Sequence, residues 1–594
     1  MIEDELRRLV DQARHGVLSR RQALERLMAF GLALPAAGFL LMEAGVAATK
    51  TPFTYKPTRR GGGGTLRLLE WQAATLLNPH FATGLKDGFG SRIFYEPLAQ
   101  WDADGNLEPV LAAEVPSRAN GGLAADGRSV VWKLKRGVTW HDGEPFTADD
   151  VLFNWRYAID PAAATVNLSS YRNLTMEKVD SHTVRVVFDA PSPFWPGQYS
   201  QVFLIPRHLF AAFGGARSRE APNNNRPVGT GPYSFVEFRP GDSLRAVLNP
   251  RYHLPGRPHF DTLEIKGGGD ASSAARAVLQ TGEYDYAGSL LVEDDVLKRM
   301  EAGGKGRVEL LEGSTTSAIY LNFADPHADV GGERSHPRTR HPLFSDARVR
   351  GAMAHLIDRK SIETYLYGRQ GRATFNYINH PDRYRSGAAG IGFDVAKANA
   401  LLDAAGWKRG TDGIREKNGT KMTLLFQAAI SSFGQKLQAI VKQSAQQAGI
   451  AVELKGVTPS VFFSSDEGNP DTYGKFYADM QTYSWTNASQ DPEGLMQSFV
   501  SWEVCSKANK WLGQNLVRWQ NADFDALFRA SESELDPVKR AALFIRMNDL
   551  VVGDGYVQPM IDRLTVRAMA RGLVAPLSGW QNDMATLAHW YREG

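Results

Sequence analysis

The most chemically suggestive stretch of this chain is TWHDGEPFTADD, residues 139–150. It places five titratable side chains within ten positions: His141, Asp142, Glu144, Asp149 and Asp150. Imidazole and carboxylate groups this close together could bind a metal ion or exchange protons. The same residues also fit a structural role. Asp142-Gly143 is a typical turn dipeptide, and Thr147 followed by Asp150 has the spacing of a helix capping box. The spacing therefore favours the closure of a helix end over an active site.

A second candidate for metal chemistry is the stretch DPHADVGGERSHPRTRH, residues 325–341. It contains His327, Asp329, Glu333, His336 and His341. Such side chains suit intermediate or hard metal ions. The stretch is rich in Gly and Arg, however, and it lacks the helical or paired spacing of a formed site. We expect a solvated surface loop, with no metal.

If this loop did bind a metal ion, the protein could be an enzyme, such as an exported metallohydrolase. We keep this as the alternative to a protein without enzymatic activity. The sequence shows no nucleophile elbow, no zinc-binding helix motif and no paired catalytic carboxylates. We therefore expect no catalytic residues, no cofactor and no enzymatic activity.

Length and charge narrow the possibilities further. A chain of 594 residues is too long for one hydrophobic core, since single cores stop growing at roughly 250–300 residues. Two large lobes are therefore expected. The net charge is only +3, from 68 basic and 65 acidic residues, and no concentrated basic patch stands out. This composition argues against a nucleic-acid-binding protein.

The N-terminal 48 residues have the pattern of an export signal. A charged start is followed by an apolar run over 27–42 and by small residues over 44–48, so we expect cleavage after Ala48. Arg20-Arg21 resembles a twin-arginine signal, although Ala23 and Glu25 depart from the usual pattern. Residues 49–64 are rich in Pro, Gly and basic side chains and are expected to form a linker.

Cysteine usage indicates the compartment. Cys505 is the only cysteine, so no internal disulfide can form, and no cysteine follows the signal to carry a lipid anchor. An exported protein without an anchor would be lost from a cell with a single membrane. We therefore expect a Gram-negative periplasm.

Strand and helix patterns alternate along the rest of the chain. Val130, Trp132 and Leu134 share one face of a period-2 pattern, and a hairpin is expected to turn at 240–242. Farther on, Asp394 and Asp536 stand where helix caps are expected. Interspersed strands and helices predict an α/β fold.

Four separated regions together resemble one family. They are EPVLAAEVPS with the following stretch to FNW (108–155), RPVGTGPYSF to LEI (226–265), 341–368 with 393–419, and 484–499 with 524–552. In this order they are similar to the family 5 extracellular solute-binding proteins, the oligopeptide, dipeptide and nickel receptors of ABC importers.

The resemblance implies an α/β, two-lobed periplasmic-binding-protein fold of the cluster C type, with an extra subdomain and two crossover hinges. Carried onto this chain, sheet domain I would take 65–98, 229–318 and 556–594. Subdomain II would take 99–228, and domain III 319–555, with hinges near 318–323 and 553–559.

The family also implies a function. The protein would capture a peptide-like or other organic solute between its lobes and deliver it to a permease and ATPase complex at the inner membrane, as a monomer that binds no nucleic acid. A chemoreceptor or a chaperone on the same fold is an alternative.

The family's charged anchors for dipeptides are missing at the matching positions. Peptide-binding members carry an Asp shortly after a Trp, where this chain has Trp485 and then Ala488; dipeptide receptors carry an Arg where this chain has Ala428. Without these two charge-assisted contacts, a dipeptide is not the expected ligand, and the solute is either another peptide or a different organic compound.

Aromatic and amide side chains remain around those positions, and we expect them to bind the ligand: Trp71, Gln72, Gln427, Tyr483, Trp485, Asp491 and Trp502. Such a set suits a sugar, an opine-like conjugate or a peptide read through its backbone. The alternative is that most of these aromatic residues belong to the core and that Asp491 starts a turn.

Overall fold

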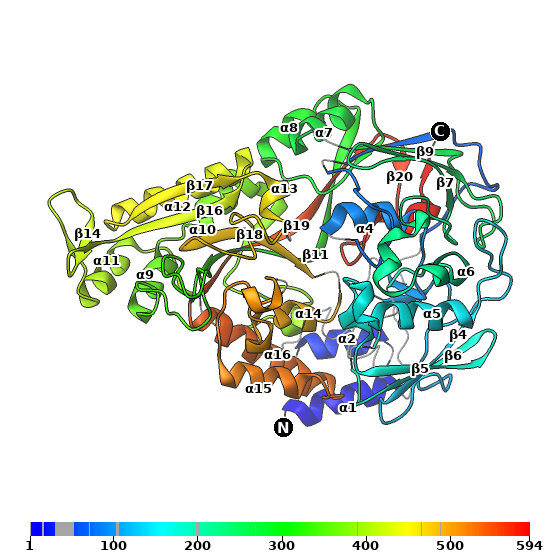
Figure 1. Cartoon of the computed structure of the whole chain (residues 1–594), viewed down its shortest axis with the longest axis horizontal. Helices are drawn as coiled ribbons and strands as arrows, with labels where there is room; N and C mark the ends of the chain where they lie inside the picture. The colour runs from blue at the N-terminus through cyan, green and yellow to red at the C-terminus, as the bar shows by residue number, and fades with distance from the viewer. Residues whose placement is uncertain are drawn as a thin grey trace.

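The computed structural model describes residues 2–14, 17–18, 20–29, 53–70, 72–82, 84–102, 106–193, 195–197, 202–267, 269–388, 390–464, 466–487, 489–511 and 513–593. Figure 1 shows two bodies side by side, joined in the middle by long strands. Each body combines sheets with covering helices. The predicted mixed α/β, two-lobed architecture is confirmed.

One large sheet runs through both bodies. Its strand order is β17-β16-β18-β11-β19-β10-β1-β9-β8-β7, and β12 also pairs with β19. The strands are β1 (Thr65–Glu70), β7 (Tyr233–Arg239), β8 (Ser243–Leu248), β9 (Thr262–Gly267), β10 (Tyr286–Ala287), β11 (Gly306–Leu321), β12 (Gly371–Ala373), β16 (Thr423–Ala429), β17 (Ala451–Val457), β18 (Met480–Asn487) and β19 (Val557–Ala570). β7 and β8 form the hairpin expected around residues 240–242.

The two longest strands, β11 and β19, connect the bodies (Figure 1). Their register shifts between Ser317 and Ala318 and also between Leu311 and Thr315. On one side of this second shift β19 pairs with β10, and on the other side β11 pairs with β18 and β19 with β12. An irregularity in the ladder bends a strand locally, so the shift marks the place where the two bodies meet.

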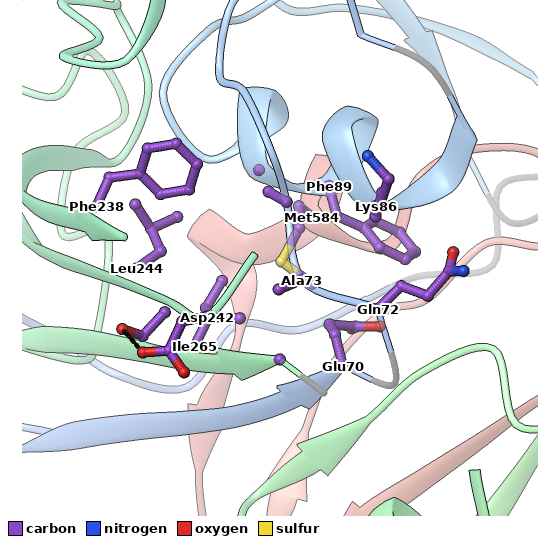
Figure 2. Close-up of a pocket in the computed structure, with 14 residues that line it drawn as sticks. Glu70, Gln72, Ala73, Lys86, Phe89, Phe238, Asp242, Leu244, Ile265 and Met584 are labelled. Carbon is purple, nitrogen blue, oxygen red and sulfur yellow. Dashed lines mark hydrogen bonds between the residues drawn. The ribbon is translucent and has the colours of Figure 1, made fainter. Parts of the chain in front are cut away.

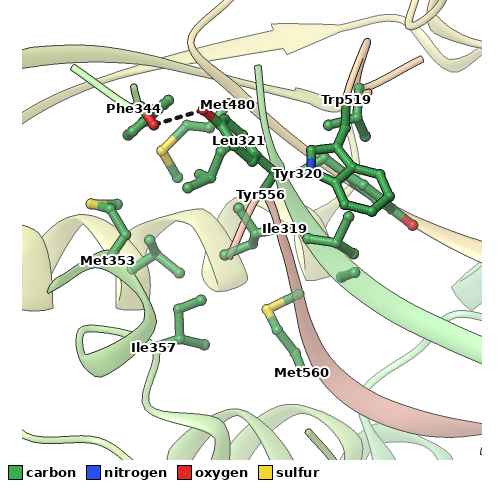
Figure 3. Packing of buried hydrophobic residues seen from close by; sticks show 14 of the residues in the cluster. Ile319, Tyr320, Leu321, Phe344, Met353, Ile357, Met480, Trp519, Tyr556 and Met560 are labelled. Atoms are coloured by element: carbon green, nitrogen blue, oxygen red, sulfur yellow. Dashed lines mark hydrogen bonds between the residues drawn. The ribbon is translucent and has the colours of Figure 1, made fainter. Parts of the chain in front are cut away.

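Each body has its own hydrophobic core. One cluster draws its residues from Ala318 through Ile561, and a second combines residues from Leu66 through Tyr286 with residues 569–590. Figure 3 shows the first cluster, where Tyr320 and Met480 pack beside Met353 and Met560. A third, smaller cluster includes Ala274, Leu297 and Val566. More than one core is expected at this chain length, since single cores stop growing at roughly 250–300 residues.

A separate three-stranded sheet lies in the second body. Its order is β4 (Ser129–Lys133), β6 (Thr183–Phe188) and β5 (Leu174–Asp180). Val130 and Trp132 are fully buried and pair with Val186 and Val184, as their period-2 pattern predicts.

Two predicted helix starts are confirmed in the first body. Asp394 caps α11 (Val395–Ala404) by accepting a hydrogen bond from the backbone N–H of Lys397. Asp536 caps α16 (Pro537–Gly553) in the same way. In both cases a carboxylate satisfies an N–H group that the first helical turn leaves without a partner.

The remaining elements cover the sheets. They are α4 (Gly84–Arg92), α5 (Ala148–Ile159), α6 (Arg207–Phe210), α7 (Ala271–Arg276), α8 (Asp294–Glu301), α9 (Ala347–His355), α10 (Arg359–Ile362), α12 (Ser432–Gln447), α13 (Pro459–Phe462), α14 (Glu493–Met496), α15 (Ala522–Ser531), and the short strands β2 (Ala99–Trp101), β3 (Leu107–Pro109), β13 (Lys408–Arg409), β14 (Arg415–Lys417), β15 (Thr420–Lys421), β20 (Leu573–Val574) and β21 (Tyr591–Arg592).

The N-terminal region begins with two helices, α1 (Ile2–Arg14) and α2 (Arg20–Ala29). They pack around a small cluster that includes Leu9, Leu18 and Leu27. Most of the apolar run predicted as the core of an export signal lies outside the described residues. Among the residues that are described, no helix has both the length and the apolar character to cross a membrane.

Candidate functional site

The stretch 139–150 closes a helix end. Thr147 and Asp150 form the predicted capping box at the start of α5, with the Asp150 carboxylate accepting the backbone N–H of Thr147 at 3.0 Å. The same carboxylate accepts the N–H of Arg207 at 3.0 Å. Asp142 pairs with His208 at 2.7 Å. The structural interpretation of these residues is confirmed.

His141 has a partner that the sequence did not reveal. Its Nδ1 accepts a hydrogen bond from the backbone N–H of Gly229 at 3.1 Å, and its Nε2 lies 3.1 Å from the carbonyl oxygen of Gly231. Burial lowers the pKa of His141 to about 4. The imidazole is therefore neutral at neutral pH, which fits one accepting and one donating nitrogen. It holds two loops together.

Residues 325–341 form a loop with many exposed residues, as expected, but the loop is anchored to the rest of the chain at two of its histidines. His327 Nε2 and His341 Nε2 lie 3.1 and 2.9 Å from one oxygen of Asp479, and the other oxygen accepts the N–H of Leu425 at 2.6 Å. His341 is fully buried. These bonds keep the pKa of Asp479 far below its usual range, in spite of burial. A buried carboxylate distant in sequence therefore anchors the loop to the sheet.

Metal binding was the other interpretation of this loop. Across the described residues, no group of three or more His, Cys, Asp or Glu side chains has a geometry that could hold a metal ion.

The predicted ligand residues of β18 differ in exposure. Tyr483 is 9% exposed and stacks on Tyr320, with ring centroids 4.2 Å apart. Trp485, two residues farther along the same face, is only partly buried, and its ring lies 6.4 Å from that of Tyr483. The two aromatic side chains form a row in which Tyr483 supports Trp485 from the core.

Gln427 and Ala428 lie in the neighbouring strand β16, and both are buried. The Gln427 amide donates to the carbonyl oxygen of Asp471 at 3.3 Å. Its own side-chain oxygen has no hydrogen-bond partner. The methyl group of Ala428, where dipeptide receptors would carry a charge, packs inside the sheet.

Two other predicted residues already have partners within the chain. Asp491 forms a two-oxygen ion pair with Arg540 and also accepts the N–H of Glu493 at 2.9 Å. Trp502 is 44% exposed, and the guanidinium of Arg529 lies 4.2 Å from its ring centroid. Trp71 and Ala488 lie outside the described residues.

The end of β18 presents a free strand edge. β11 pairs with β18 along its whole length, over 480–487, whereas β16 pairs only with residues 480–482. No strand of the described part of the chain pairs with the other edge of 483–487. Unpaired backbone groups at a sheet edge can bind an extended peptide by strand addition. Trp485 lies on this unpaired stretch of β18.

Gln72 lines a pocket in the body whose core runs from Leu66 through Tyr286 (Figure 2). Its free volume is small, about 20 Å³, and its wall is largely apolar, with Phe89, Phe238, Leu244, Ile265 and Met584. Glu70 and Gln72, from the end of β1, add polar groups beside Lys86.

Glu70 is an unusual member of this wall. It is 6% exposed, and one of its carboxyl oxygens has no hydrogen-bond partner. Burial and the nearby carboxylate of Asp583 raise the pKa of Glu70 to about 8. Arg567 does not neutralise Glu70, because it forms a two-oxygen ion pair with Asp583. Glu70 is therefore mostly protonated at neutral pH.

Another ion pair lies where β19 enters the first body. His380 Nε2 is 2.9 Å from Asp562, and His380 Nδ1 is 3.3 Å from Asp382. These carboxylates raise the pKa of His380 to about 9, against the opposing effect of burial. Sequence patterns could not indicate the whole cluster, because Asp562 is 182 residues away from His380 in the chain.

Comparisons with known proteins agree with this architecture. Residues 106–504 match the bacterial extracellular solute-binding proteins, family 5 (middle region). A putative ABC transporter peptide-binding protein of Brucella abortus is 26% identical over 474 residues, which cover 79% of this chain and 81% of the relative. The oligopeptide-binding protein AppA of Bacillus subtilis is 24% identical over 490 residues, covering 80% and 81%.

Solved structures show the same fold. AppA of Bacillus subtilis in complex with a nonapeptide superimposes with a TM-score of 0.75 at 22% identity, covering 91% of this chain and all of AppA. NikZ of Campylobacter jejuni in complex with Ni(L-His) also gives 0.75 at 20% identity, covering 89% and 99%.

The family match spans well over half of the chain. This protein therefore belongs to the family 5 extracellular solute-binding proteins, the receptors of ABC importers.

Proposed function

We propose that this receptor captures an extended peptide or a peptide-like solute between its two lobes and hands it to an ABC permease. The observation that carries the proposal is the free edge of β18 over residues 483–487. Strand addition supplies affinity through backbone hydrogen bonds, which every peptide can make whatever its side chains.

Known relatives support a peptide without specifying one. AppA is named for oligopeptides, and its structure holds a nonapeptide, whereas NikZ of the same fold holds Ni(L-His). The fold alone therefore does not choose the solute, and the choice rests on the residues of this chain.

The solute is held mainly by its backbone and by aromatic contact. Ala428 offers no charge, and the charge of Asp491 is already neutralised by Arg540. A free dipeptide would bring two charged ends close together into a cleft where neither of these residues can pair with it. Burying an unpaired charge costs several kcal/mol, so simple dipeptides are poor ligands.

Among the predicted residues, we assign solute contact to Trp71, Gln72 and Trp485. Gln72 lines a pocket at the end of β1, and Trp485 is partly accessible beside the free edge. Gln427, Tyr483, Asp491 and Trp502 act behind or beside the solute, because each already contacts another residue of the chain.

The lobes close over the solute by bending at β11 and β19. In this proposal domain III takes residues 319–555, and the remainder divides into sheet domain I and subdomain II at the boundaries expected from the family. The supporting observation is the register shift between Leu311 and Thr315, where both connecting strands pass from one body to the other.

Delivery requires export. We propose that residues 1–48 are a twin-arginine-like signal, that the mature protein acts in a Gram-negative periplasm, and that it is a monomer without enzymatic activity. The sequence pattern of this segment and the extracellular character of the family support this part of the proposal.

Calorimetry with defined peptides tests the proposal. The panel holds Ala-based peptides of two to nine residues, and scattering measures the radius of gyration with and without each peptide. We expect peptides of about four residues or longer to bind at least tenfold tighter than dipeptides and to reduce the radius. Binding of dipeptides alone, or of no peptide, contradicts strand addition at β18.

A further inference from the structure

Two arginines on β19 have opposite environments. Arg567 is 4% exposed and forms a two-oxygen ion pair with Asp583. Arg563, four residues earlier on the same strand, contacts no carboxylate of the described residues. Its one hydrogen bond is a long one, 3.4 Å, to the carbonyl oxygen of Leu290. One guanidinium is neutralised within the chain and the other is not.

Arg563 lies where the two bodies meet. In the sheet it stands opposite Thr315 on β11 and Gly371 on β12, next to the register shift. Burial lowers the pKa of Arg563; the nearby Tyr367 acts in the opposite direction, and the charge of Arg567 lowers the pKa again. A guanidinium placed there without a counter-ion costs free energy, which an anionic ligand would recover.

A row of polar side chains leads from the free strand edge to this guanidinium. Thr486 of β18 stands opposite Thr315 of β11, and Thr315 stands opposite Arg563 of β19. The hydroxyl groups of Thr315 and Thr486 are 3.0 Å apart. Directly opposite residues of paired strands project from the same face, so the row crosses three strands, starting at the edge proposed to bind the solute.

The turn that touches Arg563 is itself strained. Ser289 has φ of 52°, a left-handed conformation that is uncommon for residues other than glycine, and the next residue offers its carbonyl oxygen to Arg563. The acid Glu70 lies beside this turn, since a Cβ atom on Gly288 would lie 3.1 Å from its free oxygen. Glu70 is mostly protonated at neutral pH and does not supply the missing charge.

We propose that Arg563 is a specificity residue that binds a carboxylate group of the solute, with the hydroxyl groups of Thr315 and Thr486 lining its approach. The assignment rests on the proposed function and extends it: the solute is an anionic peptide or conjugate. The carboxylate is either the C-terminus of a peptide or an acidic side chain.

Four peptide sets separate these sources: pentapeptides with a free C-terminus, the same peptides with a C-terminal amide, and amidated peptides with one central Glu or one central Gln. Calorimetry measures the dissociation constant of each set for the wild type, Arg563→Met and Arg563→Lys. We expect the wild type to prefer free over amidated C-termini, or Glu over Gln, by at least tenfold. Arg563→Met loses this preference, and Arg563→Lys keeps part of it.

The outcomes distinguish this assignment from the proposed function. Equal binding of all four sets by the wild type, or an unchanged preference in Arg563→Met, overturns the role of Arg563 and leaves a peptide receptor intact. Binding of none of the sets by the wild type overturns the proposed function and the assignment together.

A measurement without ligand checks the unpaired state of Arg563. Arg563→Met is expected to keep or raise the melting temperature of the ligand-free protein, because it removes an uncompensated charge. Arg567→Met, the matched control, is expected to lower it strongly by leaving Asp583 unpaired. A melting temperature of Arg563→Met as low as that of the control assigns Arg563 a structural role and overturns the proposal.

Discussion

His141 and Gly229 hold each other by two hydrogen bonds: the backbone N–H of His141 donates to the carbonyl oxygen of Gly229 at 2.8 Å, and the N–H of Gly229 donates to His141 Nδ1 at 3.1 Å. The contact joins the loop before α5 to the loop before β7. A larger residue does not fit at the position of Gly229, because a Cβ atom there would lie 1.8 Å from the carbonyl oxygen of Phe94.

Removing the His141 ring should therefore affect stability and not binding. His141→Ala leaves the buried N–H of Gly229 without its acceptor, which costs about 1–3 kcal/mol of the free energy of unfolding. Urea titration measures this loss, and calorimetry is expected to show peptide affinity unchanged within about twofold. His182→Ala is the control and should be nearly neutral, because the exposed His182 ring bonds the adjacent Ser181. A selective loss of peptide affinity in His141→Ala would show that the loop takes part in binding.

Glu70 should make stability depend on pH. Its pKa is about 8 in the folded protein and near 4.5 when exposed. The folded state thus holds a proton that the unfolded state releases between these values, and Glu70 increasingly favours unfolding as pH rises from about 4.5 to 8. Glu70→Gln should raise the free energy of unfolding by about 3 kcal/mol at pH 7 and leave it almost unchanged at pH 4. An equal effect at both pH values would mean that Glu70 is ionised in the folded protein.

His380 should act in the opposite direction. Its pKa is about 9 in the folded protein, against 6.5 when exposed. A raised folded pKa stabilises the protein fully below pH 6.5, and that contribution is lost as pH rises through 9. His380→Ala should cost about 3 kcal/mol more at pH 6 than at pH 10, measured by denaturant unfolding. An Asp562→Asn variant, which removes one carboxylate partner, should flatten the wild-type pH dependence in this range; a retained slope would assign it to another group.

Trp485 should carry aromatic contact with the solute. Trp485→Ala is expected to weaken binding of the best peptide by about 1–3 kcal/mol, the range for a large apolar side chain leaving water. Trp502→Ala is the matched control, because Trp502 packs against Arg529 and Phe528 of α15 and its loss should change affinity little. Titration calorimetry of both variants decides this, and equal losses would place Trp502 in the contact surface as well.

Local patterns predicted much of the fold. The capping box of Thr147 and Asp150, the caps Asp394 and Asp536, and the buried face of Val130 and Trp132 all depend on neighbours within a few residues. In addition, the four regions that resemble the family 5 solute-binding proteins indicated the α/β class and the two lobes. Short-range hydrogen bonds and side-chain periodicity make such features readable in sequence.

The ion-pair and hydrogen-bond partners of charged side chains could not be predicted from local sequence patterns. The loop 325–341 resembled a solvated insertion because its anchor, Asp479, is 138 residues away from His341 in the chain. In the same way, nothing in the sequence distinguishes Arg563 from Arg567, although within the described part of the chain only Arg567 has a carboxylate partner.

The sequence by itself determined the class of protein, the alternation of strands and helices, and the local closure of helix ends, because these depend on residue type and spacing. Only the tertiary structure decided which charges are neutralised, which strand edge stays open, and which side chains meet at the junction of the lobes. Those outcomes depend on burial and on contacts between distant segments: desolvation and charge pairing set the pKa of a group, and the pairing of β16, β18 and β11 leaves residues 483–487 with a free edge.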